Sequence, residues 1–246
     1  MNRMFFVFLS GSTGVGLLFF LVPESDLRAA ALFYTPGSGF VLHREPGIEL
    51  MQLVLAWITG VFVSICLALL AINNLSYLHR LRGGITLRVP NGSILYLLLT
   101  LALGPGLLVN GILKQHWGRA RPREVAAFGG DKQFTKAFVL SDQCKTNCSF
   151  VSGEASLGFF GLAFMFVAPR RRRKTIVISS LLAGLLIGLV RMGAGAHFLS
   201  DVIFAGVFTF LVSCLLYPLL VVPPSEIILN LQSRTVKLYR SYQKAA

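Results

Sequence analysis

Six runs of apolar residues divide this sequence, and they constrain its fold more than any other feature. They cover about residues 4–22, 51–72, 92–113, 153–168, 175–190 and 202–222. A hydrocarbon core about 30 Å thick needs roughly 20 apolar residues of helix, whose backbone satisfies its own hydrogen bonds. A soluble core helix would carry polar residues every few positions, and these runs do not. The sequence therefore predicts an all-α, polytopic membrane protein with six transmembrane helices in one bundle, a single domain over residues 1–246.

Three local features bear on this count. The first run follows Arg3 and could serve as a signal peptide, but no small-residue cleavage site follows it promptly, so an uncleaved span is favoured. The fifth run is short, and Arg191 at its end can extend it by snorkelling. In the third run, Gly104-Pro105-Gly106 predicts a kink, because proline removes a helical hydrogen bond.

Positive charge is unevenly divided between the two sides of the predicted bundle. One side carries 13 basic residues and a single acid, Glu226, whereas the other carries 10 basic and nine acidic residues. The positive-inside rule places the first side, with both termini, in the cytoplasm. The net charge of +13 is then mostly a topology signal, and nothing indicates a nucleic-acid partner. The basic tail, about residues 223–246, is expected in the cytoplasm, either disordered or as an interfacial helix on anionic lipid.

Three polar stretches meet the outer membrane surface in this topology. They are Lys114–Pro122, Cys148–Ala155 and Arg191–Asp201. Cations at such a surface are costly unless paired, and phosphate oxygens are natural partners for guanidinium and ammonium groups. The basic residues concerned are Lys114, Arg119, Arg121 and Arg191. A helix beginning at Ser152-Gly153 would add free N–H groups, so the sequence predicts a phosphate site rather than simple contact with lipid headgroups.

His197 and Asp201 give this surface a candidate nucleophile. They are four residues apart, so on a helix they would share one face within hydrogen-bonding reach. A carboxylate there can hold one imidazole nitrogen as N–H and leave the other free to attack or to carry a proton. The alternative is a His and an Asp that only cap a membrane helix.

The spacing of these residues resembles the type 2 phosphatidic acid phosphatase superfamily over about residues 92–222. The resemblance implies a six-span fold and a periplasm-facing site that removes phosphate from a lipid without metal or other cofactor. It implies that His197 forms a phosphohistidine and that Asp201 orients it. The phosphate-holding groups that it implies are Lys114, Arg121, Arg191 and the backbone of Ser152 and Gly153.

The sequence departs from the family at Glu154. The usual Pro-Ser-Gly-His motif is replaced by Val151-Ser152-Gly153-Glu154, and the family's His there is the expected general acid. A carboxyl group can donate a proton only if its pKa rises well above about 4.3. Nearby cations oppose this rise, so we expect Glu154 to be ionised in the empty enzyme and protonated once a phosphate dianion binds. Alternatively, it serves as base for the water that hydrolyses phosphohistidine.

These residues predict a lipid phosphate phosphatase of the bacterial inner membrane, with a membrane lipid as substrate and no obligate protein partner. A weak general acid favours good leaving groups, so lipid A phosphate or undecaprenyl pyrophosphate ranks ahead of phosphatidylglycerophosphate or phosphatidic acid. A lipid phosphotransferase is a related alternative. A non-catalytic protein that binds or transports a lipid phosphate is the alternative from another class, and the Arg191, His197 and Asp201 set argues against it.

Four cysteines fall into two groups. Cys66 and Cys214 lie within predicted spans and are expected to be inert small hydrophobic residues. Cys144 and Cys148 lie in the outer loop, where a short disulfide is favoured if that loop is periplasmic. A metal site is disfavoured, because two thiols without a nearby His leave the ligand set incomplete.

Activity is expected to be independent of metal ions, because no cluster of His, Cys and carboxylate residues at metal-ligand spacing faces the predicted site. Phosphate release by purified protein should be unchanged in EDTA. Free phosphate is measured before chelation, after it, and after adding back single divalent ions. Activity that EDTA abolishes and one divalent ion restores would contradict this expectation.

Overall fold

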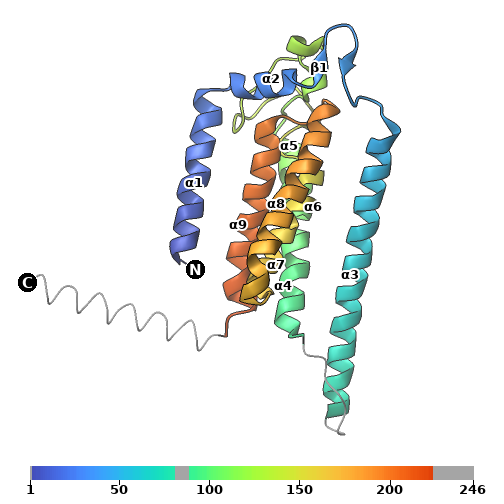
Figure 1. The fold of residues 1–246 in the computed structure, drawn as a ribbon, viewed down its shortest axis with the longest axis vertical. Helices are drawn as coiled ribbons and strands as arrows, with labels where there is room; N and C mark the ends of the chain where they lie inside the picture. The colour runs from blue at the N-terminus through green and yellow to red at the C-terminus, as the bar shows by residue number, and fades with distance from the viewer. Residues whose placement is uncertain (1, 81–88, 224–246) are drawn as a thin grey trace, which may run out of the picture.

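Helices standing side by side, with their longest described connections at one end, make up the fold (Figure 1). The computed structural model describes residues 2–80 and 89–223. The helical class predicted from the sequence is confirmed. The predicted basic tail lies, apart from residue 223, outside the described residues.

Four helices of the described chain are long and apolar enough to cross a membrane. They are Pro46–Leu75 within α3 (Pro46–Arg80), the helical stretch Asn91–His116, α8 (Arg170–Gly193) and α9 (Leu199–Leu220). Phe8–Leu21 passes the same test together with Glu24–Ala31, although the two helices meet at 84°. Gly153–Val167 is apolar but shorter. Length and composition therefore support a multi-pass protein with four or five spans, and the count of six stays a prediction.

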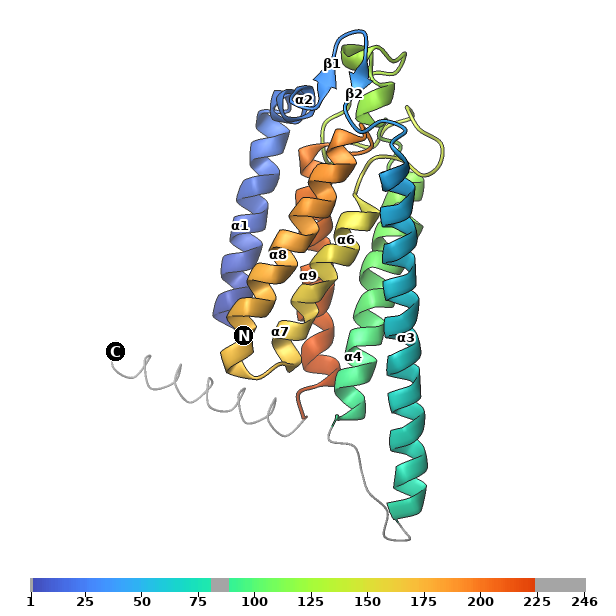
Figure 2. The ribbon, with the colours of Figure 1, turned by 45° about the vertical axis from the view of Figure 1, so that its right-hand side comes forward.

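The bend near the N-terminus turns the chain across the end of the bundle. α1 (Asn2–Leu21) runs along the bundle, and α2 (Glu24–Ala31) crosses its end (Figures 1 and 2). Asp26 and Ala30 are the buried residues of α2 and, being four apart, lie on one face of it. This face packs toward the start of α9.

A short hairpin connects α2 to the long helix α3. Strands β1 (Tyr34–Thr35) and β2 (Gly39–Phe40) are antiparallel, with Tyr34 opposite Phe40. The rings of Tyr34 and Phe40 both pack on Phe128, at centroid distances of 5.2 and 5.3 Å. α3 then runs along the edge of the bundle (Figure 2). Of its most apolar 18-residue stretch, only 6% is buried. Its exposed apolar side chains, such as Trp57, are typical of a lipid-facing helix.

The third predicted span accommodates its proline within a continuous helical path. α4 (Asn91–Leu101) continues through a π-helical segment (Ala102–Leu113) into α5 (Lys114–His116). Pro105 lies inside the π-helical segment, and the Asn110 amide donates to the Pro105 carbonyl at 2.7 Å. This path carries Lys114 to the end of the bundle where α2 lies.

The core lies where α6 (Gly153–Phe160) packs against α8 and α9. A 3₁₀ turn (Gly161–Ala163) joins α6 to α7 (Phe164–Val167). At Gly158 an added Cβ would come within 2.8 Å of the Gly184 Cα, so only glycine permits this approach of α6 to α8. The close contact brings the first turn of α6 beside the last turn of α8. The long connection between α5 and α6 has two further 3₁₀ turns, Pro122–Glu124 and Ala126–Phe128.

Candidate active site

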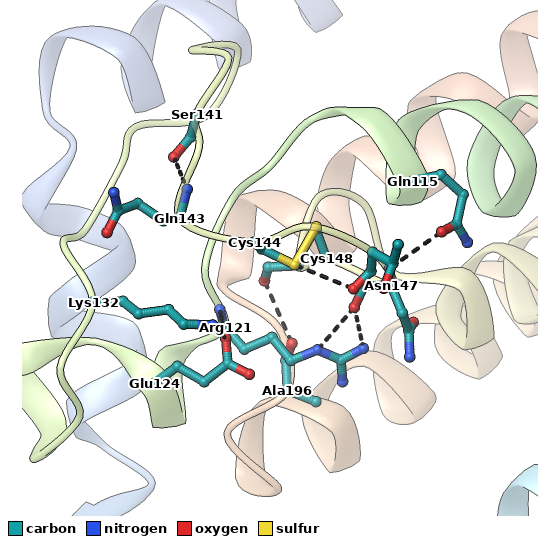
Figure 3. Close-up of a disulfide and its surroundings, with 12 residues drawn as sticks. Gln115, Arg121, Glu124, Lys132, Ser141, Gln143, Cys144, Asn147, Cys148 and Ala196 are labelled. Atoms are coloured by element: carbon teal, nitrogen blue, oxygen red, sulfur yellow. Dashed lines mark hydrogen bonds and ion pairs between the residues drawn. A yellow bond between two sulfur atoms is a disulfide. The ribbon is translucent and has the colours of Figure 1, made fainter.

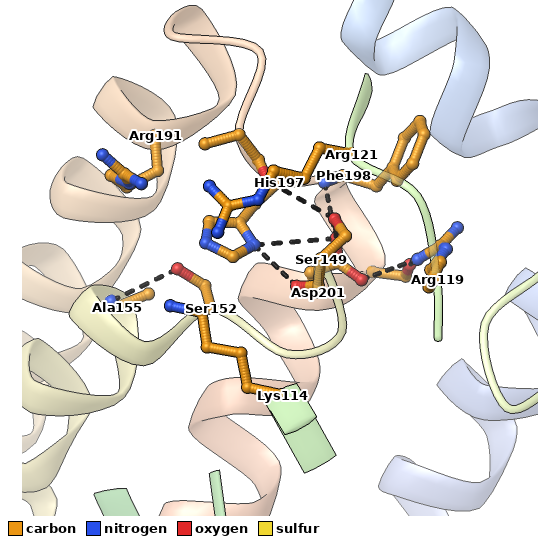
Figure 4. Close-up of polar contacts among 12 residues, drawn as sticks. Lys114, Arg119, Arg121, Ser149, Ser152, Ala155, Arg191, His197, Phe198 and Asp201 are labelled. Atoms are coloured by element: carbon orange, nitrogen blue, oxygen red, sulfur yellow. Dashed lines mark hydrogen bonds and ion pairs between the residues drawn. The ribbon is translucent and has the colours of Figure 1, made fainter. Parts of the chain in front are cut away.

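The three polar stretches predicted to meet at the membrane surface do meet, at the end of the bundle that α2 crosses (Figure 4). Lys114 begins α5, and Arg191 lies in the last turn of α8. Glu154 lies in the first turn of α6. His197 lies in the short segment between α8 and α9. Residues distant in the sequence therefore share one site.

Cationic side chains line a cleft of about 450 Å³ at this site. Lys114, Arg121 and Arg191 all line it, although each is only 5–7% exposed. Residues before and within the first turns of α3, among them Gln52, form the facing wall. Buried cations at a cleft concentrate positive potential there, which favours an anionic ligand.

Glu154 is the acidic group in contact with these cations. Its Oε1 lies 3.4 Å from Arg191 Nη2, and its Oε2 lies 3.9 Å from Lys114 Nζ. Gln52 Nε2 donates to Oε1 at 2.9 Å, which fixes the carboxylate from α3. One carboxylate thus partly offsets the charge of the three cations, and the cleft keeps a positive excess.

Arg121 is held in place by a backbone carbonyl. Its Nε and Nη2 both donate to the carbonyl oxygen of Asn147, at 3.2 and 2.6 Å. Burial, together with the nearby Arg123 and Arg191 charges, lowers the pKa of Arg121 from its usual value. A guanidinium is nevertheless charged at neutral pH. Because the carbonyl uses two of its five N–H groups, others remain for a ligand.

His197 is fully buried, and its two ring nitrogens differ sharply in their surroundings. Nδ1 lies 2.7 Å from the Ser149 carbonyl oxygen, so Nδ1 carries the proton and donates it. Among the described residues Nε2 has no hydrogen-bond partner, and it lies 3.7 Å from Glu154 Oε2. A neutral imidazole held in this way presents a lone pair on Nε2 beside the cationic cleft.

The predicted direct hydrogen bond between His197 and Asp201 is wrong in detail. Asp201 Oδ2 lies 3.8 Å from Nδ1, beyond hydrogen-bonding distance. α9 begins only at Leu199, so His197 precedes the helix and the two side chains do not have helical i, i+4 geometry. Oδ2 instead accepts from Ser149 Oγ at 2.5 Å and from the Phe198 N–H at 2.8 Å. Asp201 acts on His197 through Ser149 and through its nearby charge.

Ser152 and Gly153 begin α6, as predicted. Ser152 is the N-cap, and its Oγ accepts from the Ala155 N–H at 3.4 Å. The Ser152 N–H donates to the Asp201 carbonyl at 3.1 Å, so it is not free for phosphate. The N–H groups of Gly153 and Glu154, at the start of the helix, have no preceding helical carbonyl to bind. A side chain at Gly153 would overlap the Asn110 amide.

Arg119 was predicted to face phosphate with the other cations, and this prediction is wrong. Its guanidinium is completely buried, with Nη1 2.6 Å from Asp201 Oδ1 and Nη2 2.8 Å from Asp26 Oδ2. Burial alone would lower its pKa, but the two carboxylates raise it. Arg119 is therefore a buried partner of acids.

The predicted disulfide between Cys144 and Cys148 is present and lies beside the site (Figure 3). It closes a tight loop that contains Asn147, the carbonyl partner of Arg121. The Cys148 N–H donates to the Lys114 carbonyl at 2.8 Å. The disulfide loop is thus joined to two of the phosphate-holding candidates.

Some site residues were not predicted from the sequence. Gln52 and Asp26 lie on helices far from the three stretches, and no spacing signal connects them to the site. Ser149 lies within the Cys148–Ala155 stretch, so its neighbours were the available signal, but its contact with His197 depends on the fold.

The chain is similar to known proteins over most of its length. Residues 93–222 match the PAP2 superfamily. The chain is 37% identical to a lipid A 4'-phosphatase of Francisella tularensis subsp. novicida (strain U112), over 82% of this chain and 90% of that protein. It is 41% identical to a lipid A 4'-phosphatase of Rhizobium leguminosarum, over 42% of this chain and 45% of that protein. No solved structure matches the chain significantly.

Opening the disulfide should weaken the binding of inorganic phosphate and lower thermal stability. The loop would no longer fix the Asn147 carbonyl, and a disulfide of this kind is worth about 2 kcal/mol or more. Melting temperatures of Cys144→Ser/Cys148→Ser and of the oxidised protein are measured with and without phosphate, and phosphate should stabilise the variant less. Reductant should lower the melting temperature of the wild type and leave that of the double variant unchanged. Equal stabilisation by phosphate in both proteins would contradict the coupling.

Proposed function

The chain belongs to the PAP2 superfamily and is a membrane lipid phosphatase, and we propose that it removes the 4'-phosphate of lipid A through a phosphohistidine at His197. The observation that carries the mechanism is the state of His197. Its Nε2 is buried 3.7 Å from Glu154 Oε2 and has no hydrogen-bond partner in the described chain, while Nδ1 is fixed by Ser149.

The charges of the cleft suit a phosphate monoester. A phosphoryl group carries about −1.5 to −2 charge at neutral pH. Five basic residues line the cleft against three acidic ones, Glu45, Glu49 and Glu154, and this excess of two positive charges matches a dianion. Transfer of a phosphoryl group depends chiefly on positioning and on stabilising charge, and buried cations supply both.

In the first step, the Nε2 lone pair of His197 attacks phosphorus, and the bond between phosphorus and the sugar oxygen breaks. The leaving oxygen takes a proton from Glu154. The phosphorylated ring keeps its Nδ1 proton and becomes cationic, and the nearby Asp201 carboxylate stabilises this charge. In the second step, water attacks phosphorus and gives a proton to Glu154, the N–P bond breaks, and inorganic phosphate leaves.

Glu154 is placed to change its protonation when the substrate binds. Its carboxylate contacts Lys114 and Arg191, two cations that would also hold phosphate, and lies 3.7 Å from the nucleophilic nitrogen. An arriving dianion competes for these cations and repels the carboxylate, which favours its protonation. Substrate binding would thus create the acid that the first step needs.

The similar proteins support the choice of lipid. The relative from Francisella tularensis subsp. novicida is a lipid A 4'-phosphatase by name, and the alignment covers 90% of its length. The leaving-group argument from the sequence also ranked lipid A phosphate first, together with undecaprenyl pyrophosphate, but it assumed a good leaving group. A 4'-sugar oxygen is an ordinary alkoxide that needs a proton donor, and Glu154 is in position to be that donor.

We further propose six spans in the inner membrane, with both termini in the cytoplasm and the cleft facing the periplasm. The segment Gly153–Val167 would complete the count of six as the fourth span along the chain, and it would be shorter than the others because the site reaches into the bundle. The start of α1 and the end of α9 lie at the opposite end of the bundle from α2 and the β-hairpin (Figure 1), and residues that follow the hairpin line the cleft. A disulfide beside the cleft favours an oxidising compartment on that side.

Replacing the nucleophile should abolish turnover. His197→Ala is expected to lose at least about 10³-fold in rate, because it removes the imidazole that would form the covalent intermediate. Release of phosphate from lipid A carrying 1- and 4'-phosphates is followed by mass spectrometry, which also identifies the position cleaved. His116→Ala, at an exposed histidine of α5, is the matched control and should keep normal activity. Activity of His197→Ala within tenfold of wild type would rule out the phosphohistidine mechanism.

Removing the proton donor should slow the reaction more for substrates with a poor leaving group than for substrates with a good one. Glu154→Gln is expected to lose roughly 10²–10⁴-fold on a sugar phosphate, and much less on a lipid pyrophosphate. Initial rates on both substrates are compared for the variant and the wild type. An accumulation of phosphohistidine in the variant would assign Glu154 to the second step. Full activity on every substrate would remove Glu154 from the mechanism.

A further inference from the structure

A buried polar cluster lies behind the nucleophile, on the side away from the cleft. Asp26, Arg119, Ser200 and Asp201 are all fully buried, and none of them lines the cleft. Asp26 belongs to α2, outside the part of the chain that matches the family. A buried ion pair contributes little stability over apolar packing, so a buried carboxylate brought from a remote helix calls for a reason.

Arg119 divides its donors between two carboxylates. Nη1 donates to Asp201 Oδ1 at 2.6 Å, and Nη2 donates to Asp26 Oδ2 at 2.8 Å. A guanidinium with one carboxylate partner favours a bidentate pair that uses both carboxylate oxygens. Because Arg119 Nη2 is bound to Asp26, Asp201 accepts from Arg119 through Oδ1 alone. Its Oδ2 stays available for Ser149 and for the Phe198 N–H.

Asp26 also fixes the start of α9. Its Oδ1 accepts the backbone N–H of Ser200 at 2.8 Å, and its Oδ2 accepts from the Ser200 hydroxyl at 2.6 Å. The Ser200 hydroxyl in turn accepts from Arg119 Nη1 at 2.8 Å. A carboxylate on the first N–H groups of a helix suits the helix dipole and sets where the helix begins. Asp201 is the next residue, so its position is set by the same contacts.

We propose that Asp26 is a positioning residue for the nucleophile. Asp26 holds Arg119 and the start of α9 so that Asp201 Oδ2 binds the Ser149 hydroxyl, and the Ser149 carbonyl then fixes Nδ1 of His197. The Arg119 carbonyl also accepts the Ser149 N–H at 2.9 Å, so Ser149 is held from both sides. The inference deepens the proposed function and rests on it for the role of His197.

The charges of the cluster fit the same role. One guanidinium and two carboxylates leave an excess negative charge behind the imidazole. Phosphorylation at Nε2 makes the ring cationic, and this negative excess stabilises it. Water cannot supply the same stabilisation to a fully buried group.

The test is Asp26→Asn, which keeps the shape of the side chain and removes its charge. Arg119 and the Ser200 N–H bind different oxygens of Asp26, and asparagine replaces one of these oxygens with an NH₂ group, so one of the two donors would lose its acceptor. We expect kcat to fall about 10- to 100-fold, the usual effect of removing a group that orients an active-site residue, with KM within about twofold of wild type. Glu24→Gln is the matched control, because it makes the same charge change at an exposed position of α2. A normal kcat in folded Asp26→Asn protein would overturn the proposal.

A purely structural role would give a different result. It would lower the melting temperature and the amount of folded protein, while kcat per folded molecule stayed normal, and that outcome also overturns the proposal. If Asp26→Asn does not fold, Ser200→Ala removes one bridging hydroxyl and leaves the backbone contact. Its kcat should fall at least about threefold at unchanged KM. An unchanged kcat there would contradict the inference.

Nuclear magnetic resonance of ¹⁵N-labelled histidine separates failure of this inference from failure of the proposed function. The Nδ1 proton of His197, assigned by its loss in His197→Gln, should exchange with solvent at least about tenfold faster in Asp26→Asn than in wild type. Unchanged exchange would overturn the positioning role even if the protein cleaved no lipid tested. Conversely, equal activity of wild type and His197→Ala would overturn only the proposed nucleophile.

Discussion

The ion pair between Arg119 and Asp201 is the interaction on which the site depends. Both side chains are fully buried, and a lone charge at that depth would be strongly destabilising. The pair joins the connection after α5, which carries Arg121, to the first turn of α9, which directly follows the segment that carries His197. The cationic cleft and His197, the proposed nucleophile, are therefore held in one arrangement by a contact that lies outside the cleft.

Around this pair the site is built in two layers. The layer at the cleft contains Lys114, Arg121, Arg191 and Glu154, whose charges face an incoming anion. The layer behind it is closed to the cleft, and its hydrogen bonds end on His197. The side chains of the second layer have hydrogen-bond partners, whereas Glu154 Oε2 and Arg191 Nε in the first layer have none among the described residues. Buried polar groups with partners form rigid networks, so the second layer can hold His197 while the first stays open to an anion.

The sequence located the cleft well, because its residues follow motifs at fixed spacings next to apolar runs. It also predicted the disulfide, from two thiols in one short loop. The sequence could not predict which charged side chains pair with each other. The charge of Arg119 was evident, but its ion pair with Asp26 depends on how α2 folds over the bundle. The relation of His197 to Asp201 was misjudged because a spacing of four implies a shared face only inside a helix, and α9 begins after His197.

The bend between α1 and α2 has a consequence for biosynthesis. Asp26 emerges from the ribosome early, yet Ser200, its partner, lies 174 residues further along the chain. Throughout synthesis the first helix must keep that carboxylate in a solvated setting at the membrane surface. The buried cluster closes only when the last helix has been inserted. The arrangement behind His197 therefore cannot form before the start of α9 has been synthesised and placed against α2.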